Sequence, residues 1–563
     1  MFGKSKKKGN LDLSLKSVLF KLGFAFSIIQ FTTPKVLAAD EISLQYGPLQ
    51  FSLAVESLRL YAESGIINRD LADYARFLSP EQLETLRTAL VTKAEIEPLS
   101  ISQFFYSYQG EKILERVGSV VKTKGGQSGF YAIRSALILA ASEEEGLTPL
   151  NFLETFPLSG ITVDSVQGFD IIDELSQIIQ VSSKAIAVVE EQALIETVRE
   201  DRTFLEGING LGNFSYNKES LFLRDEERNR NFPVDLYLPE QTDINQPFPL
   251  VVISHGLGSD RSTFGYLAEY LASYGFAVAV PEHPGSNASQ IKNLLEGFAN
   301  DVTPAEEFID RPLDITYLLD TIETKYGSQI NTQEVGILGQ SFGGYTALAL
   351  AGAELNFATL NDACSNLDKS FNVSLFLQCL ALELPEETTP TNLKDSRITS
   401  AIAINPLTSA IFGREGMGKI DIPIMIVSGS SDPVTPALPE QIKPFTWLNS
   451  SEKYLALLKG GTHFSVLNES SGSIPVPSAA IGPDPKIAHN YIKQLGLLFF
   501  SESLSQNTTK SSQTGVWETP VFGCLCAGYA KSITQSVMPL SLVEWLSEDK
   551  LELRRNNRSR KKL

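Results

Sequence analysis

Histidine and cysteine, two of the residues that most often bind transition metals, are scarce in this sequence. There are four of each in 563 residues, and no histidine precedes His255. Cys524 and Cys526 form a C-x-C pattern without a nearby histidine, which makes a poor zinc site. No cysteine stands in a motif with histidine, so a catalytic cysteine is disfavoured as well. We therefore expect neither a metal centre nor a cofactor.

Positive charge is also in short supply. The chain has 47 lysine and arginine residues against 66 aspartate and glutamate residues, a formal net charge of -19. A basic face is needed to neutralise phosphates, so this balance argues against nucleic acid as a partner. Long apolar runs are missing after the N-terminus, and we expect no transmembrane span in the mature chain. No pattern in the sequence identifies a protein partner.

The first 39 residues are typical of an export signal. Four lysines within the first eight residues precede a mostly apolar stretch, Val18–Phe31, and small residues at 36–39 offer a cleavage site before Asp40. The apolar stretch is shorter than the roughly 20 residues that span a bilayer, although an uncleaved anchor is an open alternative. We predict an exported protein, periplasmic or extracellular.

The rest of the chain divides by its hydrophobic pattern. Residues 40–200 are predicted to form a mainly helical domain that opens with a short hairpin over 42–53. From 203 to 505, apolar strands alternate with helices, which predicts an α/β domain with a mostly parallel sheet and helices on both faces. Residues 506–563 form a C-terminal extension with a basic tail. The simplest role for the helical domain is to pack on or cap the α/β domain, while a role in gripping a substrate or partner is also open.

An insertion at 356–395 interrupts the α/β pattern, and insertions at this position often form a lid. It contains Cys364 and Cys379, which lie fifteen positions apart. In the oxidising compartment that the export signal predicts, a bridge between them would close a loop of useful length. We treat this pair as a disulfide candidate.

One short stretch of the α/β domain carries a chemical pattern. Apolar residues 335–338 lead into Gly339–Gly343, Gly-Gln-Ser-Phe-Gly, and a helical run rich in alanine and leucine follows at once. This is the G-x-S-x-G turn between a strand and a helix, which exposes a serine hydroxyl at the edge of a sheet. Chance alone produces the pattern with a probability of roughly 0.2 in a chain of this length, so it needs partners. Ser341 is the predicted nucleophile.

A serine hydroxyl needs an imidazole to take its proton and an acid to orient that imidazole. In this type of fold, the order along the chain is nucleophile, acid, base. Asp432 follows the apolar run 424–427, and His463 follows the run 454–458, so both lie just beyond predicted strands. We predict that Ser341, Asp432 and His463 form a catalytic triad.

The negative charge that develops on a substrate oxygen needs two fixed N–H donors. The peptide N–H of Phe342 directly follows the nucleophile, and that of Leu257 lies in a glycine-rich stretch after an earlier strand. We predict that these two groups form the oxyanion hole. His255 and His283 each stand at a strand end and can line the site, whereas His489 lies in a helical pattern and is predicted to pack or to face solvent.

These motifs resemble those of the α/β-hydrolase superfamily, over residues 203–505. The loop Ser254–Gly258, the elbow Gly339–Gly344 and the stretch Phe308–Asp314 look most like the platelet-activating-factor acetylhydrolase-like and dienelactone/polyester hydrolase-like branch. The upstream region, 40–200, is similar to an uncharacterised domain found ahead of such hydrolases. That second resemblance implies no activity.

The residues and the resemblance together predict a secreted serine hydrolase that cleaves carboxylic esters, lipid-like or acetyl, through an acyl-serine intermediate. The acetylhydrolases commonly have histidine where Gln340 stands, and the context of His463 is closer to the polyester hydrolases. Acyl length and headgroup are therefore open. The alternatives are a serine peptidase of the same fold and a catalytically inactive hydrolase-fold binding module.

Overall fold

The computed structural model describes residues 39–551 with several gaps. The residues outside it within this range are 47–48, 95, 97, 200–209, 241–246, 366, 368–369, 469–480, 505–529 and 532. The predicted export signal up to residue 38, the pair Cys524 and Cys526, and the basic C-terminal tail thus lie outside the described residues. Among the helices that are described, none is long and apolar enough to cross a membrane.

Contacts between residues divide the chain into two compact units. One consists of Met1–Glu95 with Val121–Asp164, and the other of Ile96–Val120 with Ser165–Leu563. Residues 96–120, which the sequence pattern assigns to the N-terminal domain, group with the α/β unit. The same holds for the long helix that begins at Ser165.

The first unit contains a small sheet with the strand order β2-β1-β4-β3. β1 (Glu41–Tyr46) and β2 (Leu49–Ala54) pair antiparallel, which confirms the hairpin predicted over 42–53. β4 (Gly160–Asp164) lies parallel to β1, and β3 (Val121–Thr123) lies antiparallel to β4. The region is therefore a small sheet plus helices, and the prediction of a mainly helical domain missed this sheet. Strands of three and five residues are too short to show a clear alternating pattern.

Helices cover this small sheet and bury their own core. They are α2 (Val55–Ser64), α3 (Arg69–Ala75), α4 (Pro80–Val91), α7 (Phe130–Ser142) and α8 (Pro149–Glu154). α4 begins with a capping box, in which the side chains of Ser79 and Gln82 each accept the other's peptide N–H. Leu58, Leu71 and Leu90, one from each of the first three helices, are buried in one cluster.

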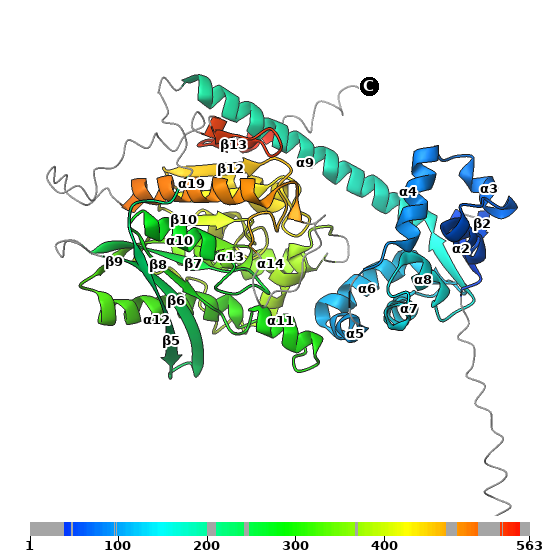
Figure 1. Cartoon of the computed structure of the whole chain (residues 1–563), viewed down its shortest axis with the longest axis horizontal. Helices are drawn as coiled ribbons and strands as arrows, with labels where there is room; N and C mark the ends of the chain where they lie inside the picture. The colour runs from blue at the N-terminus through cyan, green and yellow to red at the C-terminus, as the bar shows by residue number, and fades with distance from the viewer. Residues whose placement is uncertain are drawn as a thin grey trace, which may run out of the picture. The chain divides into compact units, whose positions relative to one another are not determined.

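The second unit is an α/β protein built on a nine-stranded sheet in the order β13-β12-β11-β10-β9-β7-β8-β6-β5 (Figure 1). The central pairs, from β8 to β12, are parallel, and antiparallel pairs lie at both edges. This mixed, mostly parallel sheet is consistent with the predicted α/β-hydrolase fold. Its strands are β5 (Tyr216–Asp225), β6 (Arg230–Pro239), β7 (Phe248–Ser254), β8 (Ala277–Pro281), β9 (Ile330–Gln340), β10 (Ile398–Ile404), β11 (Ile424–Gly429), β12 (Lys453–Leu458) and β13 (Leu540–Val543).

Alternate residues of the central strands supply two separate cores. In β7, Leu250 and Val252 join one cluster, whereas Val251 and Ile253 join the other. Helices α12 and α13 belong to the first cluster and helices α10 and α19 to the second, so helices cover both faces as predicted. Buried strands with this alternation are typical of a sheet between two helical layers. The helices of this unit are α5 (Pro98–Tyr106), α6 (Tyr108–Val120), α9 (Ser165–Arg199), α10 (Gly265–Ser273), α11 (Ala288–Leu295), α12 (Glu307–Tyr326), α13 (Phe342–Ala351), α14 (Phe357–Cys364), α15 (Ser374–Gln378), η2 (Cys379–Glu383), α16 (Gly413–Met417), η3 (Leu438–Ile442), α17 (Lys443–Trp447) and α19 (Pro485–Leu504).

Two helices from the upstream part of the chain, α5 and α6, pack within this unit. α5 contacts α11, and α6 contacts α15 of the insertion, where the Arg116 guanidinium lies 3.9 Å from the centre of the Phe371 ring. α11 in turn adjoins the predicted oxyanion loop, because a Cβ on Gly258 would lie 3.1 Å from the Ile291 side chain. This helix pair therefore contacts both the lid insertion and the helix beside the predicted site.

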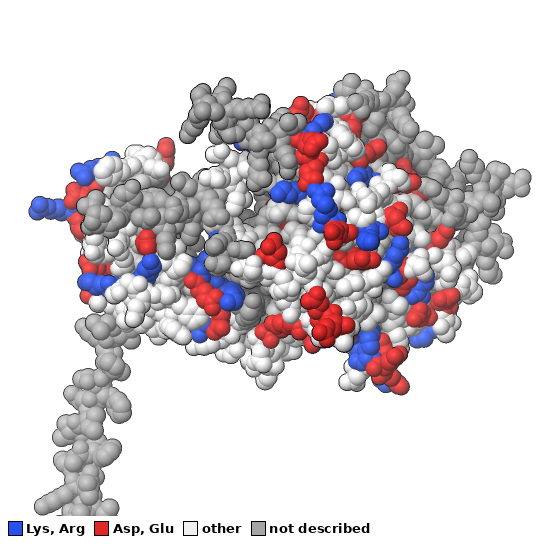
Figure 2. All heavy atoms as spheres, turned by 180° about the vertical axis from the view of Figure 1, so that it is seen from behind, with Lys and Arg blue, Asp and Glu red and all other residues white. Residues whose placement is uncertain are grey.

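Charged side chains are interspersed on the surface of the protein. Figure 2 shows lysine and arginine mixed with aspartate and glutamate over the described part of one face, without a broad basic field there. Exposed ion pairs such as Lys394–Asp421, at 2.7 Å, are part of this mixture.

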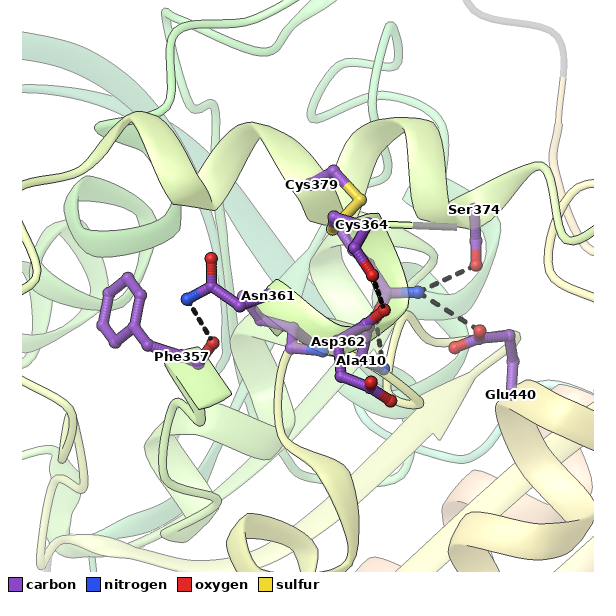
Figure 3. The surroundings of a disulfide bond; sticks show 11 residues. Phe357, Asn361, Asp362, Cys364, Ser374, Cys379, Ala410 and Glu440 are labelled. Carbon is purple, nitrogen blue, oxygen red and sulfur yellow. Dashed lines mark hydrogen bonds between the residues drawn. A yellow bond between two sulfur atoms is a disulfide. The ribbon is translucent and has the colours of Figure 1, made fainter. Parts of the chain in front are cut away.

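The insertion at 356–395 contains a disulfide between Cys364 and Cys379 (Figure 3). The bond joins the end of α14 to the start of η2, with the two sulfur atoms 1.98 Å apart. The loop that it closes spans 15 residues. The two predicted disulfide cysteines thus lie together in the structure.

Beside the disulfide, polar side chains tie the insertion to the loop after β10 (Figure 3). The side-chain carbonyl of Gln378 accepts the peptide N–H groups of Ala410 and Ile411, both at 2.9 Å. The buried carboxylate of Glu440 accepts the amide of Gln378 at 3.2 Å and the peptide N–H of Thr408 at 2.7 Å. The insertion is therefore held both by a covalent bond and by buried hydrogen bonds.

Replacing both cysteines, in the variant Cys364→Ser/Cys379→Ser, should lower the free energy of unfolding by about 3 kcal/mol. A crosslink over a loop of this length restricts the unfolded chain by roughly that amount. Urea unfolding followed by circular dichroism measures the difference. Wild-type protein treated with a reductant is the matched control and should lose the same amount; equal stability of all three samples would show that the bond does not stabilise the fold.

Candidate active site

Ser341 occupies the sharp turn between β9 and α13. Its backbone has φ 57° and ψ -116°, a conformation that non-glycine residues adopt only where the surroundings enforce it. The turn is held by the peptide N–H of Ser341, which donates to the carbonyl of Ile404 at 2.8 Å, and by that of Tyr345, which donates to Ser341 at 3.0 Å. The strand, the strained residue and the helix together form a nucleophile elbow.

The glycines of the motif are required by close backbone contacts. A Cβ on Gly339 would overlap the carbonyl oxygen of Gly343, and a Cβ on Gly343 would overlap the carbonyl oxygen of Ser254 in β7. No side chain fits at either position. The helix α13 can therefore approach the sheet closely enough to leave Ser341 at the carboxyl end of the strands.

Asp432 and His463 meet at the same edge of the sheet, in the loops after β11 and β12. Asp432 Oδ2 lies 2.7 Å from His463 Nδ1. The other carboxylate oxygen, Oδ1, accepts the peptide N–H groups of Val434 at 2.7 Å and Thr435 at 2.8 Å, and the Thr435 hydroxyl donates to Oδ2 at 2.8 Å. An acceptor with this many donors is a carboxylate, and it holds the proton of the imidazole on Nδ1.

Gln340, which precedes Ser341, connects the turn to the loop that carries His463. The amide of Gln340 donates to the carbonyl of His463 at 3.2 Å. Ser341, His463 and Asp432 are 6%, 4% and 6% exposed, so all three are largely shielded from water. The structure thus brings the three predicted triad residues to one edge of the sheet, on three neighbouring loops.

Asn405, at the end of β10, was not among the predicted site residues. Its side-chain carbonyl accepts the N–H of Gly429 at 2.9 Å, and its amide donates to the carbonyl of Thr462 at 3.4 Å. It also has a positive φ of 44°, which asparagine tolerates better than most residues. Asn405 therefore joins the loop that carries Asp432 to the loop that carries His463. Its place at a strand end, directly before a proline, is the sequence signal that could have indicated it.

The predicted oxyanion loop runs beside the elbow. A Cβ on Gly256 would overlap the side chain of Gln340, and Gly258, at φ 71°, donates its peptide N–H to the carbonyl of Ser286 at 2.9 Å. Leu257 lies between these two glycines, and Phe342 starts α13. The N–H groups of Leu257 and Phe342 thus come from two segments that are in contact across the turn.

His255 and His283 lie under the site as neutral, fully buried side chains. Nε2 of His255 accepts the peptide N–H of His283 at 3.0 Å, and a protonated ring could not accept this bond. Burial lowers the pKa of both imidazoles well below the ordinary value, and the nearby Arg311 lowers each pKa further. Both histidines are therefore part of the interior and do not line an open pocket. His489 instead stacks on Tyr266, with the ring centres 4.1 Å apart.

A second serine–histidine–aspartate chain occurs in the interior. Ser254 Oγ lies 3.0 Å from His283 Nε2, and His283 Nδ1 lies 2.9 Å from Asp314 Oδ2. All three side chains are fully buried, and the Ser254 hydroxyl also accepts a hydrogen bond from Arg311 at 3.2 Å. A serine in this position cannot reach a substrate. This chain therefore stabilises the end of β7, from which the oxyanion loop begins.

Clusters of metal-ligand side chains do not occur among the described residues: no group of three or more histidine, cysteine, aspartate or glutamate residues there is placed to hold an ion.

Comparison with known proteins gives matches in both parts of the chain. Residues 203–310 match the family described as "Platelet-activating factor acetylhydrolase, isoform II". The platelet-activating factor acetylhydrolase of Canis lupus familiaris is 25% identical over 149 residues, which is 20% of this chain and 34% of that protein. The chain is a distant relative of the acetylhydrolases. It matches only about a third of the length of this curated relative.

The acetylhydrolase match covers part of the site. The range 203–310 includes Leu257 but ends before Ser341, so the triad rests on the geometry above. Residues 38–164 match a different family, described as "Alpha/beta hydrolase of unknown function (DUF1400)". These residues lie ahead of the nine-stranded sheet and contain none of the predicted triad residues. The resemblance to an acetylhydrolase-like chain with an upstream uncharacterised domain is thereby confirmed.

The two buried neutral histidines make the stability of the protein depend on pH. Below pH 6.5 the unfolded chain takes up a proton on each imidazole, whereas the folded protein, with its lowered pKa values, does not. Their contribution is complete above pH 6.5 and is lost as the pH falls. Between pH 7.5 and 5.5 the free energy of unfolding should fall by up to about 2.7 kcal/mol, or about 1.4 kcal/mol for each of His255 and His283.

Urea titrations at pH 8.5, 7.5, 6.5 and 5.5 measure this loss. No contribution from the histidines is expected between pH 8.5 and 7.5, which provides the internal control. The variant His489→Gln removes the one other histidine whose pKa is lowered by burial. A stability that stays constant or rises toward pH 5.5 in this variant would contradict the prediction. It would mean either that His255 and His283 accept protons in the folded state or that proton uptake by the buried Glu307 and Asp314, whose pKa values burial raises, offsets their effect.

Proposed function

We propose that the protein is an exported serine hydrolase that cleaves carboxylic esters, lipid-like or acetyl, through an acyl-enzyme on Ser341. The observation that carries the proposal is the pair Asp432–His463, at 2.7 Å, attached through Gln340 to a strained serine at a nucleophile elbow. The distant relationship of the chain to the acetylhydrolases supports an ester as the substrate. Export is proposed from the N-terminal sequence alone.

In the proposed first step, His463 Nε2 removes the proton from the Ser341 hydroxyl as its oxygen attacks the ester carbonyl. Asp432 keeps the Nδ1 proton in place and stabilises the imidazolium that forms. The negative charge on the carbonyl oxygen is stabilised by the N–H groups of Leu257 and Phe342. The imidazolium then protonates the departing alcohol oxygen, and the acyl group stays on Ser341.

In the second step, a water molecule gives a proton to His463 and attacks the acyl-enzyme. The same two N–H groups stabilise the second tetrahedral species, and its collapse releases the carboxylic acid and restores the Ser341 hydroxyl. No redox step and no cofactor are involved in this sequence. The lid insertion 356–395 and the helices α5 and α6 are the segments from which we expect the acyl-binding surface to come.

A fluorophosphonate probe should label the purified protein at Ser341, because this reagent reacts with activated serine hydroxyls. Labelling and ester turnover should both be lost in Ser341→Ala, with turnover reduced at least about 1,000-fold. Ser142→Ala, an exposed serine at the end of α7, is the matched control and should behave like the wild type. Labelling that persists in Ser341→Ala would refute the assignment of the nucleophile.

A panel of esters and the corresponding amides, varied in acyl length and headgroup, then separates the alternatives. Turnover of esters well above amides supports the esterase. Preferential cleavage of peptide bonds would indicate a peptidase of the same fold, and absence of turnover together with absence of labelling would indicate a binding module.

Asp432→Asn should reduce kcat by about 10,000-fold with little change in KM. The amide preserves the shape of the side chain but no longer favours the Nδ1–H form of His463. Steady-state kinetics on the best ester of the panel measure the effect. Asp421→Asn is a suitable control, since this exposed carboxylate pairs with Lys394 and lies three residues before β11, at the opposite end of the strand from Asp432. Equal kcat for Asp432→Asn and the wild type would assign the acid to another residue.

A further inference from the structure

Arg311, in α12, is a fully buried guanidinium to which the proposed mechanism gives no role. It lies on the face of the sheet where α13 packs, and its hydrogen bonds leave none of its three nitrogens without an acceptor. Nη2 donates to the carbonyl of His255 and to Ser254 Oγ at 3.2 Å, Nη1 donates to Ser286 Oγ at 2.6 Å, and Nε donates to Thr346 Oγ1 at 3.1 Å. A charge in the interior with this many directed contacts has a fixed position.

The contacts of Arg311 converge on the oxyanion loop from both sides. The carbonyl of His255 precedes Leu257 by two residues. On the other side, the Ser286 hydroxyl accepts a hydrogen bond from Nη1. The backbone carbonyl of Ser286 accepts the peptide N–H of Gly258, the residue after Leu257, at 2.9 Å. Leu257 is therefore flanked by two segments that are bonded, directly or through one residue, to the same guanidinium.

Phe342, which carries the second predicted donor, contacts the same guanidinium through its ring. The guanidinium lies 4.7 Å from the centre of the Phe342 ring, a cation–π distance, and its Nε bond to Thr346 holds the next turn of α13. One rigid fork thus contacts the Phe342 ring directly and the segments on both sides of Leu257 through His255 and Ser286. A lysine has no planar fork and could satisfy only part of this set.

The charge of Arg311 is balanced by two buried carboxylates. Arg311 shares both carboxylates with Arg230, which pairs with Glu307 and with Asp314, each at 2.7 Å. Glu307 is linked to Arg311 through Ser286 Oγ, from which it accepts at 2.8 Å, and Asp314 is linked through His283, at 2.9 Å, and Ser254. Burial lowers the pKa of Arg311 to about 9, and the two carboxylates oppose this change, so the side chain is protonated at neutral pH. The network keeps a positive charge under the hole without exposing it to substrate.

We infer that Arg311 is a positioning residue that sets the distance between the Leu257 and Phe342 N–H groups of the oxyanion hole. The inference rests on the proposed function and deepens it. Donors in a fixed position stabilise the charge that develops on oxygen in the transition state and contribute little to binding of the uncharged ester. Loss of Arg311 therefore lowers kcat and leaves KM nearly unchanged.

A merely structural role would reduce the amount of folded protein and leave its chemistry unaltered. The two roles are separated by comparing an ester with its thionoester, in which sulfur replaces the carbonyl oxygen. Sulfur is larger and accepts hydrogen bonds weakly, so a well-placed hole favours the ester strongly. The ester-to-thionoester ratio of kcat, normalised to the number of sites that react with fluorophosphonate, reports on the hole and is independent of the folded fraction.

The test uses the full-length protein and the variants Arg311→Lys and Arg311→Met/Glu307→Gln, the second of which removes one charge of each sign. We expect the normalised ratio to fall by about 10- to 100-fold in both, with KM changed by less than about twofold. Ser286→Ala, which keeps the guanidinium but breaks its link to Gly258, should move the ratio in the same direction by a smaller factor. Arg397→Lys is the matched control, because this arginine is bonded to Asp395 at 2.7 Å before β10 and should leave the ratio unchanged.

The possible outcomes are distinct. If the wild-type protein is labelled at Ser341 but the ester-to-thionoester ratio is the same in the variants as in the wild type, the role of Arg311 is overturned and the proposed function stands. If the Arg311 variants do not fold, Ser286→Ala decides the question by the same ratio. A wild-type protein that neither reacts with fluorophosphonate at Ser341 nor hydrolyses any ester overturns the proposed function and this inference with it.

Discussion

The carbonyl oxygen of Ser254 occupies the space that a side chain on residue 343 would need, and the site depends on this close contact. Because residue 343 is glycine, α13 can approach β7 closely. Ser341, in the turn between β9 and α13, adopts a positive φ that L-residues rarely adopt. The free N–H groups at the start of α13 then lie beside the loop that leaves β7. One backbone contact therefore joins the turn at Ser341 to both segments that carry the predicted oxyanion donors.

Two serine–histidine–aspartate chains occur within this one sheet, and their surroundings separate them. His463 lies in a loop at the carboxyl edge and holds Asp432, whose carboxylate is satisfied by peptide N–H groups of its own turn. His283 lies in the interior, where burial and arginine charges keep it neutral. The histidine–aspartate distances, 2.7 Å for His463 and 2.9 Å for His283, do not distinguish the two sets. Exposure does: Ser341, His463 and Asp432 are each 4–6% exposed, whereas Ser254, His283 and Asp314 are completely buried.

The segments around the site come from distant parts of the chain. The insertion is held by its disulfide and by the buried Gln378–Glu440 contacts, and it meets α6 through the Arg116–Phe371 stack. α5 reaches α11, which packs on the oxyanion loop. Helices α5 and α6, which precede the sheet by about a hundred residues, thus pack within the α/β unit beside the insertion and the predicted oxyanion loop.

The sequence by itself determined the features that are local along the chain: the elbow around Ser341, the strand ends that carry Asp432 and His463, the hairpin at 42–53 and the alternation of strands and helices. These follow from hydrophobic period, glycine placement and chain order, all of which can be read in a short window. Only the tertiary structure decided the roles of Asn405, Gln340 and Arg311, and the pairing of β1 with β4. Each of these depends on which polar groups or short strands meet across the fold, and a buried polar group reveals its partner only after packing has removed water from both.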